Sequence, residues 1–431
     1  MSIRIDKMGP VRERITVSVP GSKSVTNRAL LLAAMAGGKS CIRGCLESDD
    51  SRHFIECLKT LGFGLKERAA EAGNIDIEIN GTGGDIPEKR AAIDVGSAGT
   101  AARFLTAMLA LSEGEWEVRS SEQMKRRPMQ PLIKSLREAG AEVRCLEEEG
   151  CFPMVIKGNA AAAGPFCVNI DESSQFLSAL MIAAGAKDRE ILIKAEGSHG
   201  LKYVDMTAEL MRKSGASVDK KEREYHVRGP YSPADMDVEP DASAAAYFYA
   251  LAAVSGGEFL VRGMSRGLMQ GDVAFTGILE KMGCTVTQHP EGLAVKGPEG
   301  GKLKGGFTAD MSAMSDQALT LAAIAPFADG PVAIEGIGHI RKQESDRINS
   351  MAVNLKAMGI NYDERPDGIT VYPGEPAGCE IKSFGDHRVA MAFAVTALKA
   401  GGMSIDDPGC CAKTFPGFFE IINNLLPGGT Q

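Results

Sequence analysis

Long apolar runs are missing from this sequence of 431 residues. No stretch approaches the ~18 consecutive apolar residues of a membrane-spanning helix, so a membrane protein is not expected. The first residues, Met1–Asp6, lack the apolar core of a secretion signal. The ten cysteines include no C-x-x-C pair, and the six histidines are scattered without metal-ligand spacing. The sequence therefore predicts a cytoplasmic protein with reduced thiols and no bound metal.

An excess of positive charge is also absent. The formal net charge is −8 and there is a single Trp, which argues against a general nucleic-acid-binding surface. A local cationic pocket remains compatible with this charge, because the placement of charges governs the binding of small anions. The contents of 44% apolar and 24% charged residues are those of a globular protein. The length predicts two or three domains.

The sequence contains an internal repeat. Six Ala-rich segments open with small polar or charged residues and end at glycines that lie 71 to 76 residues apart: Gly38, Gly114, Gly185, Gly256, Gly330 and Gly401. In five repeats a second predicted helix also ends in a glycine, as helix C-termini often do, at Gly62, Gly140, Gly215, Gly283 and Gly359. The sixth repeat has a variant second helix, Phe418–Leu426, before Pro427. One such repeat buries little apolar surface, so six predict two domains of three repeats each.

The stretch Pro20–Leu30 joins a predicted strand, Ile15–Val19, to a predicted helix, Arg28–Ala36. A strand, a tight break and a helix start together direct backbone N–H groups and positive partial charge outward. Lys23 and Arg28 add two cations at this point, which predicts a phosphate site. The residues do not match the P-loop pattern G-x-x-x-x-G-K-[ST]. A capped surface helix with two solvated cations is the alternative interpretation of this stretch.

The other repeats carry unusual residues at their helix starts. Ser, Thr and Asp are ordinary N-caps and explain most positions. They do not explain cations in or near a first turn, where the helix dipole disfavours them. Charge runs between the helices are usually solvated, but they would form cationic walls if the six helix starts converged on one cleft. The residues and runs concerned are Arg103, Gln175, His387, Arg388, Lys125–Pro128, Arg341–Arg347 and Lys413–Pro416.

Seven motifs, in order, resemble those of the EPSP synthase (3-phosphoshikimate 1-carboxyvinyltransferase) family: Pro20–Leu30, Ser97–Arg103, Met124–Pro128, Ser173–Phe176, Glu344–Arg347, Asp386–Arg388 and Ala412–Pro416. The resemblance implies an α/β fold, an inside-out α/β barrel of two domains, each with three β-α-β-α-β-β repeats. Residues 1–20 with 240–431 would form one domain and residues 21–239 the other, with the active site in the cleft between them.

The resemblance also implies an activity. The enolpyruvyl group of phosphoenolpyruvate (PEP) would pass to the 5-hydroxyl of shikimate 3-phosphate, with release of phosphate, in the shikimate pathway of aromatic amino-acid biosynthesis. It implies no metal and no organic cofactor. A monomer that binds neither nucleic acid nor membrane is expected.

The resemblance assigns site residues by motif. PEP would bind Lys23, Ser97, Gly99, Arg127, Gln175, Arg347, Arg388 and Lys413. Shikimate 3-phosphate would bind Lys23, Ser24, Arg28, Ser173, Ser174, Gln175, Asp316, His339 and Gln343. Three places depart from the common pattern. Gln343 stands where the family often has Lys, with Lys342 one residue earlier, and His339 stands where many members have Asn. The stretch Gly197–Tyr203 lacks the usual Ser-x-Pro-Tyr, which leaves its ligand contact open.

The implied chemistry needs a base for the hydroxyl and an acid that protonates C3 of PEP and later takes the proton back. Asp316 is the predicted base and also the predicted N-cap of its helix. Glu344 and Lys23 are the candidates for proton transfer at C3. The planar guanidinium groups of Arg347 and Arg388 suit the PEP carboxylate. A side chain at position 99 would enter the PEP space, so glycine is expected there.

Two alternatives stay open. The related transferase that acts on UDP-N-acetylglucosamine usually has a reactive Cys in a loop before Ile-Gly-Ala-Arg-Pro, and Lys125–Pro128 has none. Cys145 and Cys151 lie beside the acidic run Glu147–Glu149, which disfavours a thiolate. The other alternative is a phosphate-binding or RNA-end-binding module without transfer activity. The charge of −8 and the absence of an aromatic–basic stripe count against it.

Overall fold

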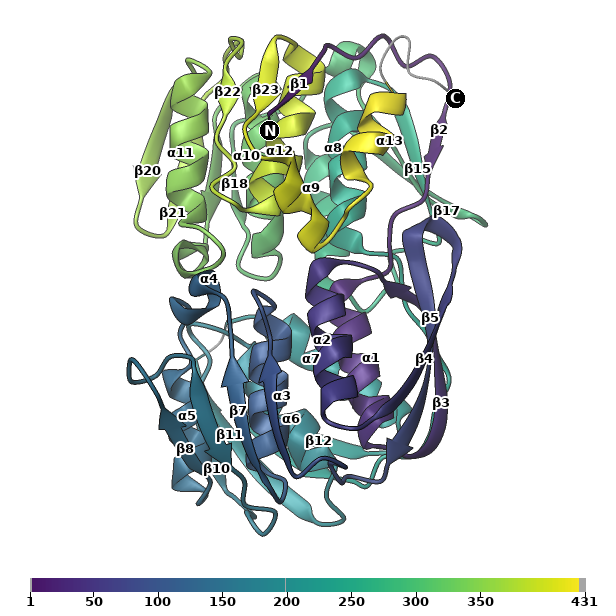
Figure 1. Ribbon diagram of the computed structural model, residues 1–431. Helices are drawn as coiled ribbons and strands as arrows, with labels where there is room; N and C mark the ends of the chain where they lie inside the picture. The colour runs from purple at the N-terminus through teal and green to yellow at the C-terminus, as the bar shows by residue number, and fades with distance from the viewer. Residues whose placement is uncertain (1, 198, 426–431) are drawn as a thin grey trace. The chain divides into compact units, whose positions relative to one another are not determined.

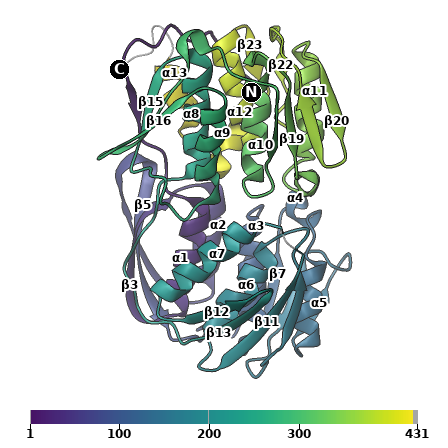
Figure 2. The same ribbon diagram turned by 180° about the vertical axis from the view of Figure 1, so that it is seen from behind.

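The computed structural model describes residues 2–197 and 199–425. The chain divides into two compact units, of which unit 1 is Met1–Pro20 with Glu239–Gln431 and unit 2 is Gly21–Val238 (Figure 1, Figure 2). Within the described residues no helix has the length and apolarity needed to cross a membrane. The same residues include no group of three or more His, Cys, Asp or Glu side chains placed to hold a metal ion.

The second repeat shows the sheet pattern that five of the six repeats follow. It runs β6 (Arg90–Asp94), α3 (Gly99–Ala110), β7 (Glu115–Arg119), α4 (Glu122–Lys125), α5 (Gln130–Glu138), β8 (Glu142–Cys145) and β9 (Met154–Lys157). The strands lie in the order β6-β7-β9-β8, with β6 parallel to β7 and the other neighbours antiparallel. Among the described residues, five four-stranded sheets share this topology, and a three-stranded sheet, β1-β23-β22, is the sixth.

The remaining elements of unit 2 are α1 (Lys23–Met35), β3 (Gly37–Leu46), α2 (Asp49–Thr60), β4 (Gly64–Ala69), η1 (Glu71–Gly73), β5 (Asn74–Thr82), β10 (Phe166–Asn169), α6 (Gln175–Gly185), β11 (Glu190–Glu196), α7 (Leu201–Lys213), β12 (Ser217–Lys221), β13 (Glu224–Arg228) and β14 (Met236–Asp237). In the first and second repeats of unit 1 they are β2 (Ile15–Val17), α8 (Ala242–Ser255), β15 (Glu258–Arg262), η2 (Gly271–Ala274), α9 (Phe275–Lys281), β16 (Thr285–His289), β17 (Gly292–Lys296), η3 (Glu299–Gly301), β18 (Phe307–Asp310), η4 (Ser315–Gln317), α10 (Ala318–Ile324), η5 (Ala325–Phe327), β19 (Val332–Glu335), η6 (Gly338–Lys342), α11 (Arg347–Ala357), β20 (Tyr362–Arg365) and β21 (Gly368–Val371). The last repeat has β22 (Glu380–Ile381), α12 (His387–Ala400), β23 (Met403–Ile405), η7 (Pro408–Lys413), α13 (Phe418–Asn424) and β1 (Ile3–Ile5).

Two strands pair in the unit opposite to the helix that follows them in sequence. Strand β2 precedes α1 of unit 2, yet it pairs in parallel with β15 of unit 1. Strand β14 precedes α8 of unit 1, yet it pairs in parallel with β3 of unit 2. Each of these two strands is the parallel edge strand of the first sheet in its unit. That sheet therefore has all four strands.

Ala-rich helices form the core of each unit. Helices α1, α3 and α6 are buried nearly all round in unit 2, and α8, α10 and α12 are buried in the same way in unit 1. A helix that is apolar on every face has to be enclosed, because no face prefers water. Helices α8, α10 and α12 lie side by side, with the sheets of unit 1 outside them (Figure 1, Figure 2).

The predicted ends of the second helices are confirmed. Gly62, Gly140, Gly215, Gly283 and Gly359 all follow a helix and have φ between +75° and +98°. The predicted ends of three buried helices are wrong: α1 stops at Met35, α3 at Ala110 and α10 at Ile324. The next residues explain α10, because Pro326 cannot continue the hydrogen-bond ladder. For the variant sixth helix, α13 ends at Asn424, and Leu426 lies outside the described residues.

Candidate active site

In unit 2 the starts of α3 and α6 are joined through Arg103. Its Nη1 donates to the carbonyl oxygen of Gly99 at 3.1 Å and to Oε1 of Gln175 at 3.0 Å. The Gln175 amide also donates to Oγ1 of Thr100 at 3.3 Å. A Cβ at Gly99 would lie 2.5 Å from Nη1 of Arg127 and 2.7 Å from Nη1 of Arg103. The structure therefore brings Gly99, Arg127 and Gln175 together, and guanidinium groups fill the space that a side chain at position 99 would enter.

The contacts of Arg103 within the fold explain why an arginine stands at this position, and the sequence analysis missed them. Its Nη2 donates to the carbonyl oxygen of Pro128 at 3.3 Å, and its guanidinium lies 5.4 Å from the ring centre of Phe176. Carbonyl oxygens and an aromatic face stabilise a buried guanidinium. A bound anion is therefore not needed to explain a cation near the start of α3.

Arg28 is almost fully buried and connects α1 with α7. Its Nε donates to Oγ1 of Thr207 at 2.7 Å, its Nη1 to the carbonyl oxygen of Ser24 at 2.8 Å, and its Nη2 to that of Tyr203 at 3.3 Å. Burial lowers the pKa of Arg28 to about 10, and the charge effect of Tyr203 opposes this. Arg28 stays protonated at neutral pH and provides a fixed positive charge beneath the start of α1.

Lys23 pairs with a carboxylate that sequence reasoning did not select. Its Nζ lies 3.1 Å from Oδ2 of Asp50, whose side chain is 2% exposed. Asp50 stands in the first turn of α2, where an acidic residue is ordinary, so nothing in the sequence marks it. The structure thus holds Lys23 at the N-terminus of α1 by an ion pair.

The serines of the third repeat lie at the start of α6. Oγ of Ser173 accepts a hydrogen bond from the Gln175 backbone N–H at 3.3 Å. Ser174 is buried, and a Cβ at Gly200 would approach its Oγ to 2.5 Å, so the loop before α7 packs against it. Ser24 and Ser97 are half-buried, near the starts of α1 and α3. Of the stretch Gly197–Tyr203, Ser198 lies outside the described residues.

In unit 1 the buried side chain of one arginine forms ion pairs with three carboxylates. Arg347 is 1% exposed and donates from Nε to Asp386 at 2.8 Å, from Nη1 to Asp316 at 2.8 Å and from Nη2 to Glu344 at 3.0 Å. Nη2 of Arg388 lies 2.8 Å from the other oxygen of Asp316. Two guanidinium groups therefore share one carboxylate. Burial lowers the pKa of Arg347, but Asp386, Glu344 and Asp316 together raise it above its ordinary value, so the group stays charged.

In unit 1 the cations expected to line a cleft are paired with carboxylates. Nζ of Lys413, a residue 7% exposed, lies 3.6 Å from Glu344, and both arginines are paired with carboxylates. Carboxylates compensate these cations because unpaired buried charges would be costly. An incoming anionic group could take over donors that Asp316 and Glu344 now occupy.

His339 and Gln343 join the same cluster. Nε2 of His339 lies 2.9 Å from Oγ of Ser315, and Oε1 of Gln343 accepts a hydrogen bond from Nη1 of Arg347. Lys342 is exposed. The structure thus places Gln343 against Arg347. The role of Gln343 in binding a ligand stays a prediction.

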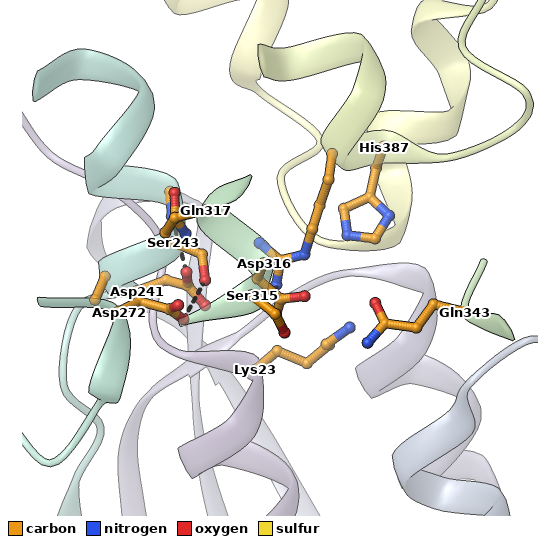
Figure 3. A network of polar contacts seen from close by, with 12 residues as sticks. Lys23, Asp241, Ser243, Asp272, Ser315, Asp316, Gln317, Gln343 and His387 are labelled. Carbon is orange, nitrogen blue, oxygen red and sulfur yellow. Dashed lines mark hydrogen bonds and ion pairs between the residues drawn. The ribbon is translucent and has the colours of Figure 1, made fainter. Parts of the chain in front are cut away.

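The predicted N-cap role of Asp316 is wrong. Asp316 lies inside η4, and α10 begins after Gln317 without a side-chain cap. Its carboxylate oxygens are used by guanidinium groups. The true cap in this cluster is Asp386, whose Oδ1 accepts from the backbone N–H of Arg388 at 2.9 Å. Sequence reasoning treated Asp386 as an ordinary cap and missed its ion pair with Arg347, which only the fold brings about. Figure 3 shows Asp316 between His387 on one side and Asp241, Ser243 and Asp272 on the other.

Comparisons with known proteins identify the family of this chain. A sequence profile of the EPSP synthase (3-phosphoshikimate 1-carboxyvinyltransferase) family matches residues 7–422. The chain belongs to the EPSP synthase family. A family member from Halalkalibacterium halodurans, 3-phosphoshikimate 1-carboxyvinyltransferase 2, is 41% identical, and the match covers 98% of this chain and 95% of that protein. The 3-phosphoshikimate 1-carboxyvinyltransferase of Nostoc punctiforme is 40% identical, over 95% of this chain and 96% of that protein.

Solved structures carry the same fold. The EPSP synthase of Acinetobacter baumannii matches with a TM-score of 0.80 and 26% identity, over 98% of this chain and 97% of that one. An enolpyruvyl transferase from Streptomyces tendae matches with a TM-score of 0.75 at 16% identity, over 98% of this chain and 96% of that one, which is a likeness of fold. The α/β fold expected from the EPSP synthase motifs is thereby confirmed.

Proposed function

We propose that this protein transfers the enolpyruvyl group of PEP to the 5-hydroxyl of shikimate 3-phosphate and releases phosphate. Membership of the EPSP synthase family supports this reaction. The observation that carries it in the structure is the pair Arg347 and Arg388, which share the carboxylate of Asp316 at 2.8 Å each. Planar guanidinium groups bind carboxylates in two-point geometry, so the carboxylate of PEP can replace that of Asp316.

The phosphate of PEP is assigned to Lys23, Arg127 and Lys413. The backbone of Gly99, with Ser97 and Gln175, completes the PEP contacts. Arg127 lies next to the Gly99 backbone, and Gln175 is held beside both by Arg103, which supports a common role. Cations placed around a transferring phosphate stabilise the charge that develops as it leaves.

Shikimate 3-phosphate is assigned to residues at the starts of α1 and α6 and to the cluster of unit 1. These residues are Lys23, Ser24, Arg28, Ser173, Ser174, Gln175, Asp316, His339 and Gln343. Helix N-termini bind phosphate through free N–H groups and the helix dipole, which supports this choice. The fixed charge of Arg28 adds attraction, because its donors anchor it beneath α1.

The reaction proceeds in two steps. Asp316 removes the proton of the 5-hydroxyl, whose oxygen bonds to C2 of PEP while C3 accepts a proton from Glu344 or Lys23. The resulting tetrahedral ketal then loses phosphate as the C3 proton returns to the same group, and Asp316 passes the hydroxyl proton to the departing phosphate. Both acid–base candidates are held by a counter-charge, Glu344 by Arg347 and Lys23 by Asp50. The charged side chains supply the electrostatic stabilisation, so the proposed mechanism uses no metal and no organic cofactor.

Three further features belong to the proposal. The active site lies in the cleft between a domain of residues 1–20 with 240–431 and a domain of residues 21–239. The protein works as a monomer in the cytoplasm. It binds neither nucleic acid nor membrane, in keeping with its net charge of −8.

The test measures phosphate release by the purified protein. Release is expected only when PEP and shikimate 3-phosphate are both present. Turnover with UDP-N-acetylglucosamine in place of shikimate 3-phosphate would favour the related transferase. Binding of shikimate 3-phosphate without any turnover would favour a non-catalytic phosphate-binding module. Either result would refute the proposal.

A further inference from the structure

The carboxyl group of Asp272 stands near Asp316 and takes no part in the mechanism above. Asp272 is 5% exposed and lies in η2, outside every motif of the sequence analysis. Its Oδ2 accepts a hydrogen bond from Oγ of Ser243 at 2.8 Å, and Ser243 stands in the first turn of α8. Asp272 and Ser243 lie together on one side of Asp316 in Figure 3.

The backbone around Asp272 is fixed to the start of α8. Oε1 of Gln270 accepts from the N–H of Ala242 at 2.9 Å, and its Nε2 donates to the carbonyl oxygen of Pro240 at 2.8 Å. The carboxylate of Glu239 accepts from the N–H of Met269 at 3.0 Å. These bonds hold η2 in place, so Asp272 cannot relieve a repulsion by moving away with its backbone.

The charges that face Asp272 come from three elements. Asp316 of η4 and Asp241, the N-cap of α8, are negative, and Arg388 of α12 is positive. Tyr247 of α8, a buried residue, adds a hydroxyl next to Arg388. Burial, followed by the charge of Asp316, raises the pKa of Asp272 to about 6, while Arg388 and the Ser243 hydroxyl oppose this. Asp272 is therefore ionised at neutral pH and becomes neutral in mild acid.

The position of Asp272 matters for the proposed reaction because Asp316 has to accept a proton in it. Arg347 and Arg388, whose nitrogens lie 2.8 Å from Asp316, remain positive charges beside it after the PEP carboxylate has taken over their donors. A nearby positive charge favours the ionised form of a carboxylate. A general base needs the opposite tendency. A fixed negative charge nearby raises the proton affinity of a carboxylate, and it does so strongly in a buried site.

We propose that Asp272 is a positioning residue for catalysis, whose negative charge behind Asp316 and Arg388 keeps Asp316 basic enough to accept the 5-hydroxyl proton. The proposal rests on the proposed function, because it takes Asp316 as the base. It predicts that protonating Asp272 weakens Asp316 as a base.

The first test is the pH profile of kcat for Asp272→Asn. Asparagine keeps the size of the side chain and can still accept the Ser243 hydrogen bond, but it carries no charge. The wild-type kcat should fall through a step near pH 6 as pH is lowered, in line with the pKa of Asp272. The variant should lose this step, and its kcat at neutral pH should be about tenfold lower, while KM for both substrates changes less than kcat. A variant profile that superimposes on the wild type would overturn the proposal.

Ser243→Ala is the second test, and it keeps the charge of Asp272. The hydroxyl stabilises the ionised carboxylate, so its removal should move the acidic step to higher pH. The two variants thus shift the profile in different ways, which a loss of packing alone would not do. If Asp272→Asn fails to fold, an acidic step unmoved by Ser243→Ala overturns the proposal by itself.

A third measurement separates this inference from the proposed function. The folded protein keeps the proton of Asp272 up to about pH 6, whereas an unfolded chain releases it near the ordinary pKa of 3.8. Asp272 therefore lowers stability progressively as pH rises from about 4 to 6, and the effect is constant above that. The wild-type Tm, relative to that of Asp272→Asn, should fall over this range. A difference in Tm that does not change with pH would overturn the charge assignment, and absence of phosphate release by the wild type would overturn the proposed function instead.

Discussion

At the scale of single residues, the cluster around Arg347 in unit 1 consists of oppositely charged side chains in ion pairs. Arg347 contacts Asp316, Glu344 and Asp386, and each carboxylate is in turn held by another donor. Removal of one member of a buried pair leaves the other uncompensated, so these residues depend on one another. The buried cations of this cluster are therefore each compensated by a carboxylate.

The change Asp316→Asn tests the base. Asparagine keeps the size of the side chain, and Asp316 caps no helix, so the fold should be retained. The change removes a counter-charge of Arg347 and Arg388, so the Tm should fall. Loss of a general base typically costs 10²–10⁴-fold in rate, so kcat should fall by about that factor. Affinity for shikimate 3-phosphate, measured by calorimetry, should change far less than kcat.

Asp237→Asn is the matched control for this change. Asp237 forms a surface ion pair with Arg43, and its side chain is 78% exposed. The control should retain wild-type kcat and Tm, because exposed ion pairs contribute little. Normal turnover of Asp316→Asn would instead place the base elsewhere, with Glu344 the leading candidate.

At the scale of elements, backbone conformation decides where the second helices end. Gly359 follows α11 with φ +75°, and a Cβ added there would meet nothing within 4 Å. Gly359→Ala should therefore cost only the left-handed backbone strain, about 1 kcal/mol of the free energy of unfolding. Denaturant unfolding measures it.

Gly277 provides the opposite case within α9. It has helical geometry, and an added Cβ again meets nothing within 4 Å. Gly277→Ala should raise the free energy of unfolding by roughly 0.5–1 kcal/mol, because alanine loses less backbone freedom on folding. Equal effects of the two substitutions would contradict the assignment of Gly359 as a conformational helix stop.

At the scale of the whole molecule, the chain passes between its units only at Pro20–Gly21 and Val238–Glu239. Predicted contacts for each substrate are divided between the units, so a bound substrate would bridge them. Shikimate 3-phosphate should therefore reduce the radius of gyration measured by solution X-ray scattering. Inorganic phosphate at the same concentration and ionic strength is the control for a salt effect. A scattering profile unchanged at saturating shikimate 3-phosphate would argue against closure.

The sequence by itself was enough to recognise the repeat and the family. It also distinguished the Ala-rich buried helices from the second helices that end in glycine. Apolar periodicity and glycine punctuation are local properties, so Gly140 and Gly215 could be recognised as helix stops without a fold. Residues of short motifs such as Lys23, Gly99 and Arg347 could be selected because the family motifs fall around them in order. Their roles toward ligands stay predictions.

Only the tertiary structure decided which charges meet. Asp50, Asp272 and Asp386 look like ordinary acidic residues at helix starts or in loops, and their partners lie 27 or more positions away in sequence: Lys23, Ser243 and Arg347. The same holds for Asp316, which local pattern predicts to be a cap and the fold turns into the shared partner of two arginines. Electrostatic compensation acts through space across repeats, so it leaves no local pattern for sequence analysis to detect.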